Sequence, residues 1–166
     1  MTLLLALSFA VFGVDSVRFP TLSSDNLERQ AFTLPADFGG ERNVVFVAFK
    51  REQQAEVDSW LPHVQGLLAR IPGTEYYELP TIGRMVGLIR GYIDRGMARG
   101  ITSRAARERT ITLYIDKTPF KEALAIGTEA SIHVLVVDRA GTVHWRSTGA
   151  FTSAKARGMA EALAAR

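Results

Sequence analysis

Four side chains on one expected helix have the types that acid–base chemistry uses. They are Glu52, Glu56, Asp58 and His63. No nucleophile accompanies them, and the chain contains no cysteine, which excludes thiol catalysis, disulfides and thiolate metal sites. We interpret the four side chains as solvated surface groups, and we predict no catalytic residue.

The remaining histidines are a weak basis for a metal site. His133 and His144 lie on two strands that are expected to pair, so they could be close together. Two histidines without a nearby carboxylate motif fall short of the ligand set that zinc requires. The sequence also has no phosphate loop, nucleophile elbow or dinucleotide fingerprint. We therefore predict surface histidines, no metal and no cofactor.

One candidate ligand site follows the first apolar run, where a helix is expected to begin. Exposed N–H groups at a helix start can bind an anion, and Lys50 and Arg51 add positive charge there. The alternative is a solvated first turn. The residues that would line such a site are Lys50, Arg51, Gln53, Gln54 and Arg146.

A second candidate is the arginine-rich stretch over residues 84–109. Its arginines outnumber its acidic residues, which are only Asp94 and Glu108. Met85, Leu88, Ile89, Tyr92 and Ile93 form one stripe of the expected helix. Glycine recurs every fourth residue at 83, 87 and 91, and close approach of another backbone would explain its cost in a helix. The functional interpretation is a helix that docks a partner or a membrane surface through Arg90, Arg95 and Arg99. The alternative is an ordinary amphipathic helix followed by a solvated basic loop.

Length and charge limit the class of protein. The chain has 166 residues and a formal net charge of +3, enough for one domain with a core but too little charge for a typical nucleic-acid binder. Residues 1–14 carry no charge and are mostly apolar. We expect residues 1–16 to be a secretory signal or leader and 17–166 to be the domain; the alternative is a first buried strand or helix.

Strands and helices are expected to alternate along the chain. β-Rich runs predict strands at 44–49, 74–79 and 110–115, and the first is entirely apolar, as in a strand buried on both faces. Residues 26–34 predict a short edge strand or hairpin. We expect Pro62 to kink or restart the first helix, Pro80 to close the second strand, and Thr118 to cap a helix that Gly127 ends. Helices are predicted at 50–71, 82–97, 119–126 and 153–164, with an irregular basic stretch over 99–109.

The clearest local pattern lies in the last third of the chain. Two β-branched runs flank the turn Asp138-Arg139-Ala140-Gly141, where Asp can bond its own turn backbone and Gly tolerates positive φ. This predicts a β-hairpin over residues 132–146. Trp60 and Trp145 are expected to be packing anchors. Together the elements predict an α/β fold of three layers, with a mixed central sheet and helices on both faces.

This pattern resembles the thioredoxin-like superfamily, in its peroxiredoxin and membrane-tethered thiol–disulfide oxidoreductase form, from about Phe19 to Leu163. The resemblance places a nucleophilic cysteine at the start of the helix after the first buried strand, where this chain has residues 50–54 and no cysteine. It also places a cis proline near Ser131, where this chain has none. Redox chemistry is therefore not expected.

A narrower resemblance is to the thioredoxin-like family of mitochondrial ATP synthase assembly factors and its bacterial relatives. It implies a chaperone or assembly role without turnover. Together with the apolar residues 1–14 and the arginine-rich stretch, it leads us to expect a protein partner such as a membrane complex, a location outside the cytoplasm and peripheral membrane contact. The alternatives are an enzyme or binding protein for a small anion near residues 50–54, and a structural subunit of a larger complex. The resemblance is carried by Trp60-Leu61-Pro62, Tyr77-Glu78-Leu79-Pro80, Leu135-Val136-Val137-Asp138, Val143-His144-Trp145 and Gly149.

Overall fold

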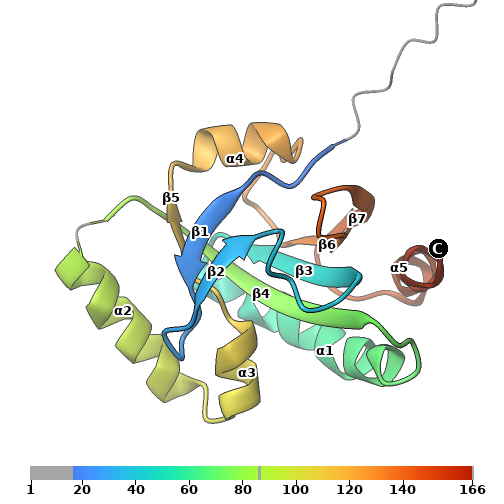
Figure 1. The fold of residues 1–166 in the computed structure, drawn as a ribbon, viewed down its shortest axis with the longest axis horizontal. Helices are drawn as coiled ribbons and strands as arrows, with labels where there is room; N and C mark the ends of the chain where they lie inside the picture. The colour runs from blue at the N-terminus through green and yellow to red at the C-terminus, as the bar shows by residue number, and fades with distance from the viewer. Residues whose placement is uncertain (1–16, 86, 166) are drawn as a thin grey trace, which may run out of the picture.

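The computed structural model describes residues 17–85 and 87–165, so the leader predicted over residues 1–16 lies outside the described residues. Its central sheet contains β3 (Arg42–Ala48), β4 (Thr74–Gly83), β5 (Leu113–Ile115), β6 (His133–Val137) and β7 (Val143–Thr148). The strand order is β5-β4-β3-β6-β7 (Figure 1). β4 is parallel to β3 and β5, whereas β6 is antiparallel to β3 and β7. The sheet is mixed, as predicted.

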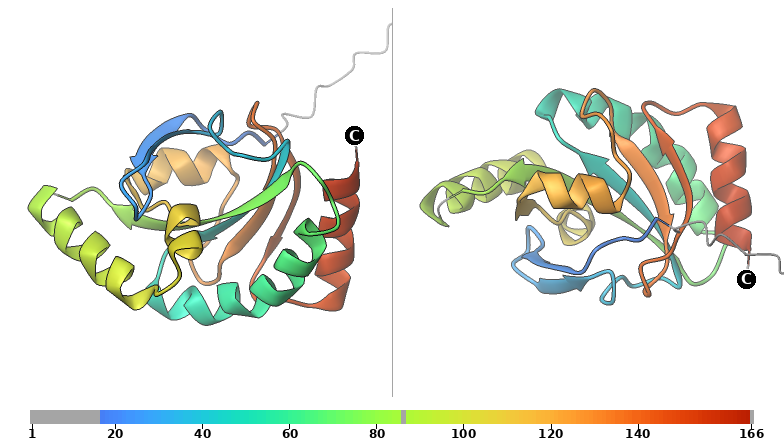
Figure 2. Two further views of the ribbon diagram at one scale, coloured as in Figure 1. Left: turned by 60° about the horizontal axis from the view of Figure 1, so that its bottom comes forward. Right: turned by 90° about the horizontal axis from the view of Figure 1, so that it is seen from above.

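Two layers cover the faces of this sheet (Figure 2). One layer contains α1 (Gln54–Leu68), preceded by a short 3-10 turn at Arg51–Gln53, and α5 (Ser153–Ala164). The other contains α4 (Lys117–Ala123) and an antiparallel hairpin of β1 (Leu22–Asp25) and β2 (Ala31–Leu34). The predicted three-layer α/β fold is confirmed. The hairpin begins earlier than residue 26, where the sequence pattern placed it.

Strand β3 lies at the centre because both of its faces are apolar. Val45 and Val47 pack into the cluster under the hairpin and α4, whereas Val44 and Phe46 pack into the cluster under α1 and α5. All four side chains are 0% exposed. Alternation of side chains along a strand therefore supplies both layers from one run of residues.

One helix and one strand both continue through a proline. Helix α1 continues through Pro62, which is exposed, so water can satisfy the carbonyl that loses its helical partner. Strand β4 continues past Pro80 to Gly83. Pro80 pairs with Ala48, the last residue of β3, and it falls between the Glu78–Thr110 bridge and the β4–β5 ladder that begins at Thr81. Its missing N–H therefore interrupts only the edge of the ladder.

The basic segment is more helical than predicted. Residues 82 and 83 belong to β4, and α2 (Gly87–Gly100) follows. The stretch expected to be irregular contains α3 (Arg104–Arg109), whose N-cap Ser103 accepts a hydrogen bond from the N–H of Ala106. Within residues 17–85 and 87–165, no helix combines the length and the apolar character needed to cross a bilayer.

The helix caps around α4 also differ in detail. Asp116, not Thr118, is the N-cap, because its carboxylate accepts the N–H of Thr118. The chain leaves the helix at Ala125, which has φ of 48°, before it reaches Gly127. The predicted strand over 110–115 is regular only from Leu113, with isolated bridges at Thr110 and Ile111.

The predicted hairpin of β6 and β7 is confirmed. The Asp138 carboxylate accepts the N–H groups of Ala140 and Thr142, both at 2.9 Å, and Gly141 has φ of 86°. His133 pairs with Thr148, so the hairpin places His133 and His144 toward opposite ends and does not bring them together. His133 is buried, contrary to the surface position predicted, and one of its ring nitrogens contacts the carbonyl of Thr128.

Both tryptophans pack in the layer of α1 and α5, as predicted. Trp60 is 0% exposed and donates its indole N–H to the carbonyl of Gly149 at 3.0 Å. The rings of Trp145 and Phe151 both pack edge-to-face against the Trp60 ring. The distances between ring centroids are 6.3 Å for Trp145 and 5.5 Å for Phe151. Gly158 of α5 lies against Trp145, where a Cβ atom would stand 2.7 Å from the indole nitrogen.

We expect Gly158→Ala to lower the free energy of unfolding by about 1 kcal/mol. Alanine is better than glycine in a helix by about 1 kcal/mol, but overlap with the indole costs about 1–3 kcal/mol. The measurement is urea denaturation followed by circular dichroism.

The matched control is Gly66→Ala in α1, where a Cβ atom would meet nothing within 4 Å. It should raise the free energy of unfolding by up to about 1 kcal/mol. Removing the indole with Trp145→Ala should make Gly158→Ala neutral or stabilising. A stabilising Gly158→Ala in the original chain would contradict this account of the packing.

Candidate functional site

The turn between β3 and α1, where the sequence predicts an anion site, is closed by Gln53. Its side-chain oxygen accepts the N–H groups of Phe49 at 2.8 Å and Lys50 at 3.2 Å. Its side-chain nitrogen donates to the carbonyl of Glu129 at 2.8 Å. Gln53 is 4% exposed, so it fills this turn, whereas Lys50 and Arg51 are exposed beside it.

The two other residues proposed for that site have partners of their own. Gln54 donates to Asp58 at 3.0 Å and to Glu78 at 3.3 Å. Arg146, on β7, donates to the carbonyl of Leu124 at 3.1 Å. Gln53 and Arg146 thus both bond to the connection between α4 and β6, at different points.

Glu78 is a buried carboxyl group next to this turn. It lies on β4 and is 9% exposed. Burial raises its pKa above the ordinary value of 4.5, the hydrogen bond from Gln54 acts in the opposite direction, and nearby Asp58 adds to the increase. Among the described residues, no three His, Asp or Glu side chains are placed to hold a metal ion. Glu56, one of the four acid–base side chains considered in the sequence, accepts the N–H of Ile132 at 3.1 Å.

The arginine-rich segment divides into two parts. In α3, Arg104 pairs with Glu108, Arg107 with Glu28 and Arg109 with Glu75. In α2, Arg90 faces the sheet, whereas Arg95 and Arg99 are exposed and form no ion pair with any described residue. Among the described arginines of this stretch, Arg84, Arg95 and Arg99 are exposed without an ion pair and are therefore available to a partner.

Most of the apolar stripe predicted over residues 85–93 faces solvent, although Ile93 is half-buried and Met85 precedes α2. Leu88 is 90% exposed, Tyr92 74%, Ile89 48% and Met85 37%, and α2 contributes no buried residue to either core cluster. An ordinary amphipathic helix would turn this stripe inward. The expected close approach of a backbone at its glycines is also absent from the described part of the chain: nothing lies within 4 Å of a Cβ at Gly83 or Gly87, and only Arg95 is near Gly91.

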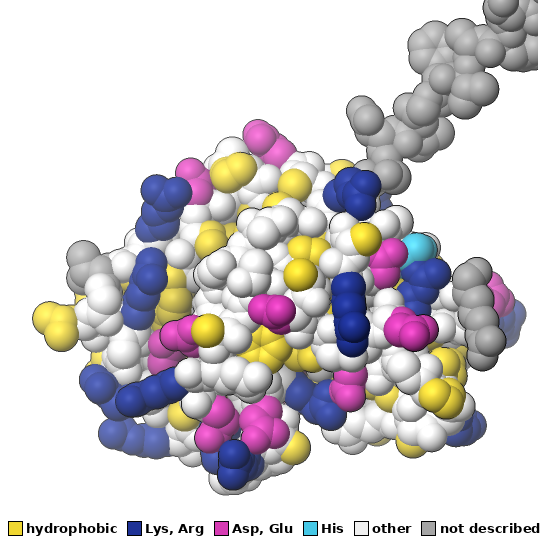
Figure 3. Space-filling model, in the orientation of Figure 1, with side chains coloured by type: hydrophobic (Ala, Val, Ile, Leu, Met, Phe, Trp, Pro, Cys, Tyr) yellow, Lys and Arg dark blue, Asp and Glu magenta, His cyan; other side chains and the backbone are white. Residues whose placement is uncertain are grey.

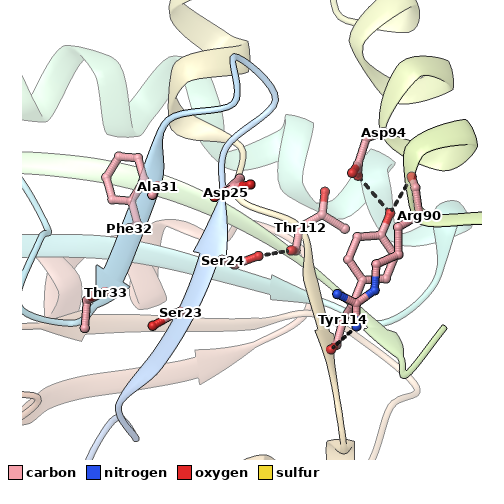
Figure 4. Close-up of a pocket in the computed structure, with 10 residues that line it drawn as sticks. All are labelled: Ser23, Ser24, Asp25, Ala31, Phe32, Thr33, Arg90, Asp94, Thr112 and Tyr114. Atoms are coloured by element: carbon pink, nitrogen blue, oxygen red, sulfur yellow. Dashed lines mark hydrogen bonds between the residues drawn. The ribbon is translucent and has the colours of Figure 1, made fainter. Parts of the chain in front are cut away.

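A cleft of about 440 Å³ lies on the inner side of α2, between this helix, the β1–β2 hairpin and β5 (Figure 4). This volume is within the range of sites that hold small ligands. Its lining combines hydroxyl groups, two aromatic rings, two carboxylates and one guanidinium. The lining residues are Ser23, Ser24, Asp25, Ala31, Phe32, Thr33, Arg90, Asp94, Thr112 and Tyr114.

The outer edge of β5 forms one wall of this cleft. The carbonyl of Thr110 accepts the backbone N–H of Leu27 at 3.1 Å, whereas that of Thr112 accepts the hydroxyl of Ser24 at 2.6 Å. The carbonyl of Tyr114 accepts the Arg90 guanidinium, at 3.4 Å, as its one side-chain donor among the described residues. Main-chain bonding between the turn after β1 and the segment before β5 therefore exists at one end of the cleft, and side chains replace it toward the other end.

Tyr114 joins α2 to this edge. Its hydroxyl donates to Asp94 at 2.8 Å, and the Arg90 guanidinium lies 5.0 Å from the ring centre (Figure 4). Burial, followed by the bond to Asp94 and its charge, raises the pKa of Tyr114 well above 10. The phenol therefore stays protonated at neutral pH and can donate its hydrogen bond to Asp94.

Sequence reasoning located Arg90 but missed the rest of the cleft. Thr110, Thr112 and Tyr114 alternate with apolar residues, which identifies a strand but not the partner of its edge. The opposite wall comes from Ser23, Ser24 and Asp25, about ninety residues earlier in the chain. A second cleft of about 390 Å³ lies at the end of α4, between Thr118 and Gly127, and Lys50, Arg51 and Gln54 line neither cleft.

No protein-family description and no curated protein matches this chain. Solved structures do resemble it. A putative electron transfer protein from Aquifex aeolicus VF5 has a TM-score of 0.64 and 10% identity over 89% of this chain and 95% of that one. The exposed lipoprotein thioredoxin of Streptococcus pneumoniae strain TIGR4 has a TM-score of 0.54 and 10% identity over 87% and 98%.

A putative thiol:disulfide interchange protein DsbE from Chlorobium tepidum has a TM-score of 0.53 and 12% identity over 89% of this chain and 96% of that one. At such low identity, these similarities establish the fold alone. The chain therefore has a thioredoxin-like fold, of the kind found in thiol–disulfide oxidoreductases, and contains no cysteine.

We expect Glu78→Gln to raise the free energy of unfolding at pH 7. Because the pKa of Glu78 is raised in the folded state, the folded chain holds this proton more tightly than the unfolded chain. Stability therefore falls as pH rises from the unfolded pKa to the raised folded pKa, and it stays lower above that range. The amide of the Glu78→Gln variant does not titrate, so the variant does not lose stability in this way. The difference in free energy of unfolding between the variant and the original chain should therefore be small at pH 3 and largest at neutral pH.

The measurement is urea denaturation at a series of pH values. Glu161→Gln makes the same change at an exposed site on α5 and should shift the free energy of unfolding by less than about 0.5 kcal/mol at every pH. A Glu78→Gln variant that is less stable than the original chain at pH 7 would show that the carboxylate is favoured where it lies.

Proposed function

We propose that this chain is a non-catalytic thioredoxin-like protein that holds an extended segment of a protein partner in the cleft between β1, β5 and α2. The observation that carries the proposal is the divergence of β1 from the outer edge of β5. An added strand can use the backbone groups of such an edge, while side-chain pockets select its sequence.

The backbone of β1 favours the same ligand. Asn26 bonds to Gln30 across the hairpin, so alternation along an antiparallel pair directs the backbone groups of Ser23 and Asp25 away from β2 and toward the cleft. The opposite wall offers Tyr114, whose carbonyl accepts a long bond from Arg90, its one side-chain donor among the described residues. Both walls thus present main-chain groups that an extended peptide could bond.

Binding without turnover is consistent with the side chains present. The chain has no cysteine, and Gln53 fills the turn at which the thioredoxin-like resemblance would place a reactive thiol. The cleft holds hydroxyl groups, but none of the described histidines lines it to act as their base. We assign Arg90 and Asp94 to orienting a bound segment.

The biological role that we propose is chaperone-like assistance to the assembly of a membrane complex, outside the cytoplasm. Its support is the sequence resemblance to assembly factors, together with the apolar residues 1–14. A structural neighbour described as an exposed lipoprotein thioredoxin agrees with such a location. A bound client segment would need no chemistry from this chain.

We expect Ser23→Trp to abolish peptide binding by filling the exposed side of the cleft. The probes are fluorescein-labelled peptides of six to ten residues, a panel of varied sequences built on alternating Thr and Val. Binding is measured by fluorescence anisotropy as the protein is titrated into each peptide. N-methylation at alternate residues of a bound peptide should weaken it about tenfold, because two backbone hydrogen bonds contribute roughly 0.5–1.5 kcal/mol each.

Ser153→Trp is the matched control, because it places the same indole at an exposed position on α5. It should leave binding unchanged. The proposal is wrong if no peptide in the panel binds in a manner sensitive to Ser23→Trp, or if N-methylated peptides bind as tightly as the parent peptides.

A further inference from the structure

The side chains on the outer face of α2 change from apolar to basic along the helix. Leu88, Tyr92, Arg95 and Arg99 are separated by four, three and four residues, so they follow one another along a single stripe. All four are exposed. The apolar residues therefore occupy the first half of the stripe, and the arginines occupy the second half.

This face is positively charged and carries no acidic residue. Asp94 turns inward to the Tyr114 hydroxyl. Figure 3 shows an apolar side chain protruding at the outer end of the α2 side of the molecule, with Lys and Arg side chains gathered along the same side. The charge of this face is thus complementary to an anionic partner.

The order of residue types matches a lipid surface. With a rise of about 1.5 Å per residue, Tyr92 lies about 6 Å along the axis from Leu88, Arg95 about 10 Å and Arg99 about 16 Å. Interfacial helices bury their apolar residues about 5–10 Å deep, with tyrosine at headgroup level and basic residues at the phosphates. The change from apolar to basic residues along the axis therefore follows the change in polarity with depth at a lipid surface.

We propose that the outer face of α2 docks on the surface of an anionic lipid bilayer. Leu88 and Ile89 at the start of the helix enter the acyl boundary, Tyr92 lies at the interface, and Arg95 and Arg99 bind lipid phosphates. The helix is inclined to the membrane, with its N-terminal end deepest. The cleft residues Arg90 and Asp94 lie on the opposite side of α2, so docking leaves the cleft accessible. This inference is independent of the peptide proposal.

The first experiment measures sedimentation of the full chain with vesicles. We expect binding to vesicles of phosphatidylcholine with 30% phosphatidylglycerol, and at least tenfold weaker binding to phosphatidylcholine alone. Arg95→Gln combined with Arg99→Gln should weaken the partition about 30-fold, because each arginine near the surface contributes about fivefold. Leu88→Ser should weaken it about tenfold, and Leu88→Ile should restore it.

Arg70→Gln combined with Arg157→Gln is the matched control. It removes two exposed arginines outside α2, one just after the end of α1 and one on α5. It should change the partition less than threefold. The apolar residues 1–14 are the same in every variant, so differences between variants report on α2. Equal binding of all variants would overturn the proposal.

The second experiment measures how deeply each position of α2 enters the bilayer. Because the chain has no cysteine, a single cysteine at position 88, 92 or 99 carries the only label. An environment-sensitive nitrobenzoxadiazole label should shift its emission to shorter wavelength most at position 88, less at 92 and least at 99. A reversed or uniform order would overturn the inclined docking. Failure to bind vesicles, with cross-linking of a protein through position 88, would assign this face to a protein partner instead.

Discussion

Burial of β3 on both faces is the constraint on which the rest of the structure depends. A strand whose side chains are apolar in both directions needs a layer on each side, and Val44 to Val47 are fully enclosed. The layers differ in construction. Two helices cover one face, whereas the hairpin and a short helix cover the other. The cleft with its polar lining lies at the rim of the sheet, where β5 ends it.

Local signals in the sequence were sufficient for the interior of the fold. The apolar run of β3, the Asp138–Gly141 turn and the α5 spacing each specify an element through neighbouring residues alone. The partners of the β5 edge could not be predicted from neighbouring residues. Its carbonyls are bonded by residues far away in the chain, and Ser24 reaches Thr112 across 88 positions. Helical spacing likewise identified the α2 stripe, but spacing does not tell whether such a stripe faces a core or solvent.

The molecule separates the thioredoxin-like scaffold from the position at which that scaffold usually works. At the β3–α1 junction, Gln53 satisfies the backbone with its own amide and bonds onward to Glu129. What is distinctive in this chain lies instead on the β5 side, where Tyr114 connects a helix with no buried residues to the sheet. One phenol with two partners, Asp94 and Arg90, sets the position of both the cleft wall and the exposed face.

The two tryptophans give the molecule an optical asymmetry. Trp60 and Trp145 both belong to the layer of α1 and α5, with rings in edge contact, while the opposite layer contains phenylalanine and tyrosine. Indole emission therefore reports on one side of the sheet only. Loosening of the hairpin and α4 would leave that emission nearly constant, and an apparently single transition in it would describe half of the protein.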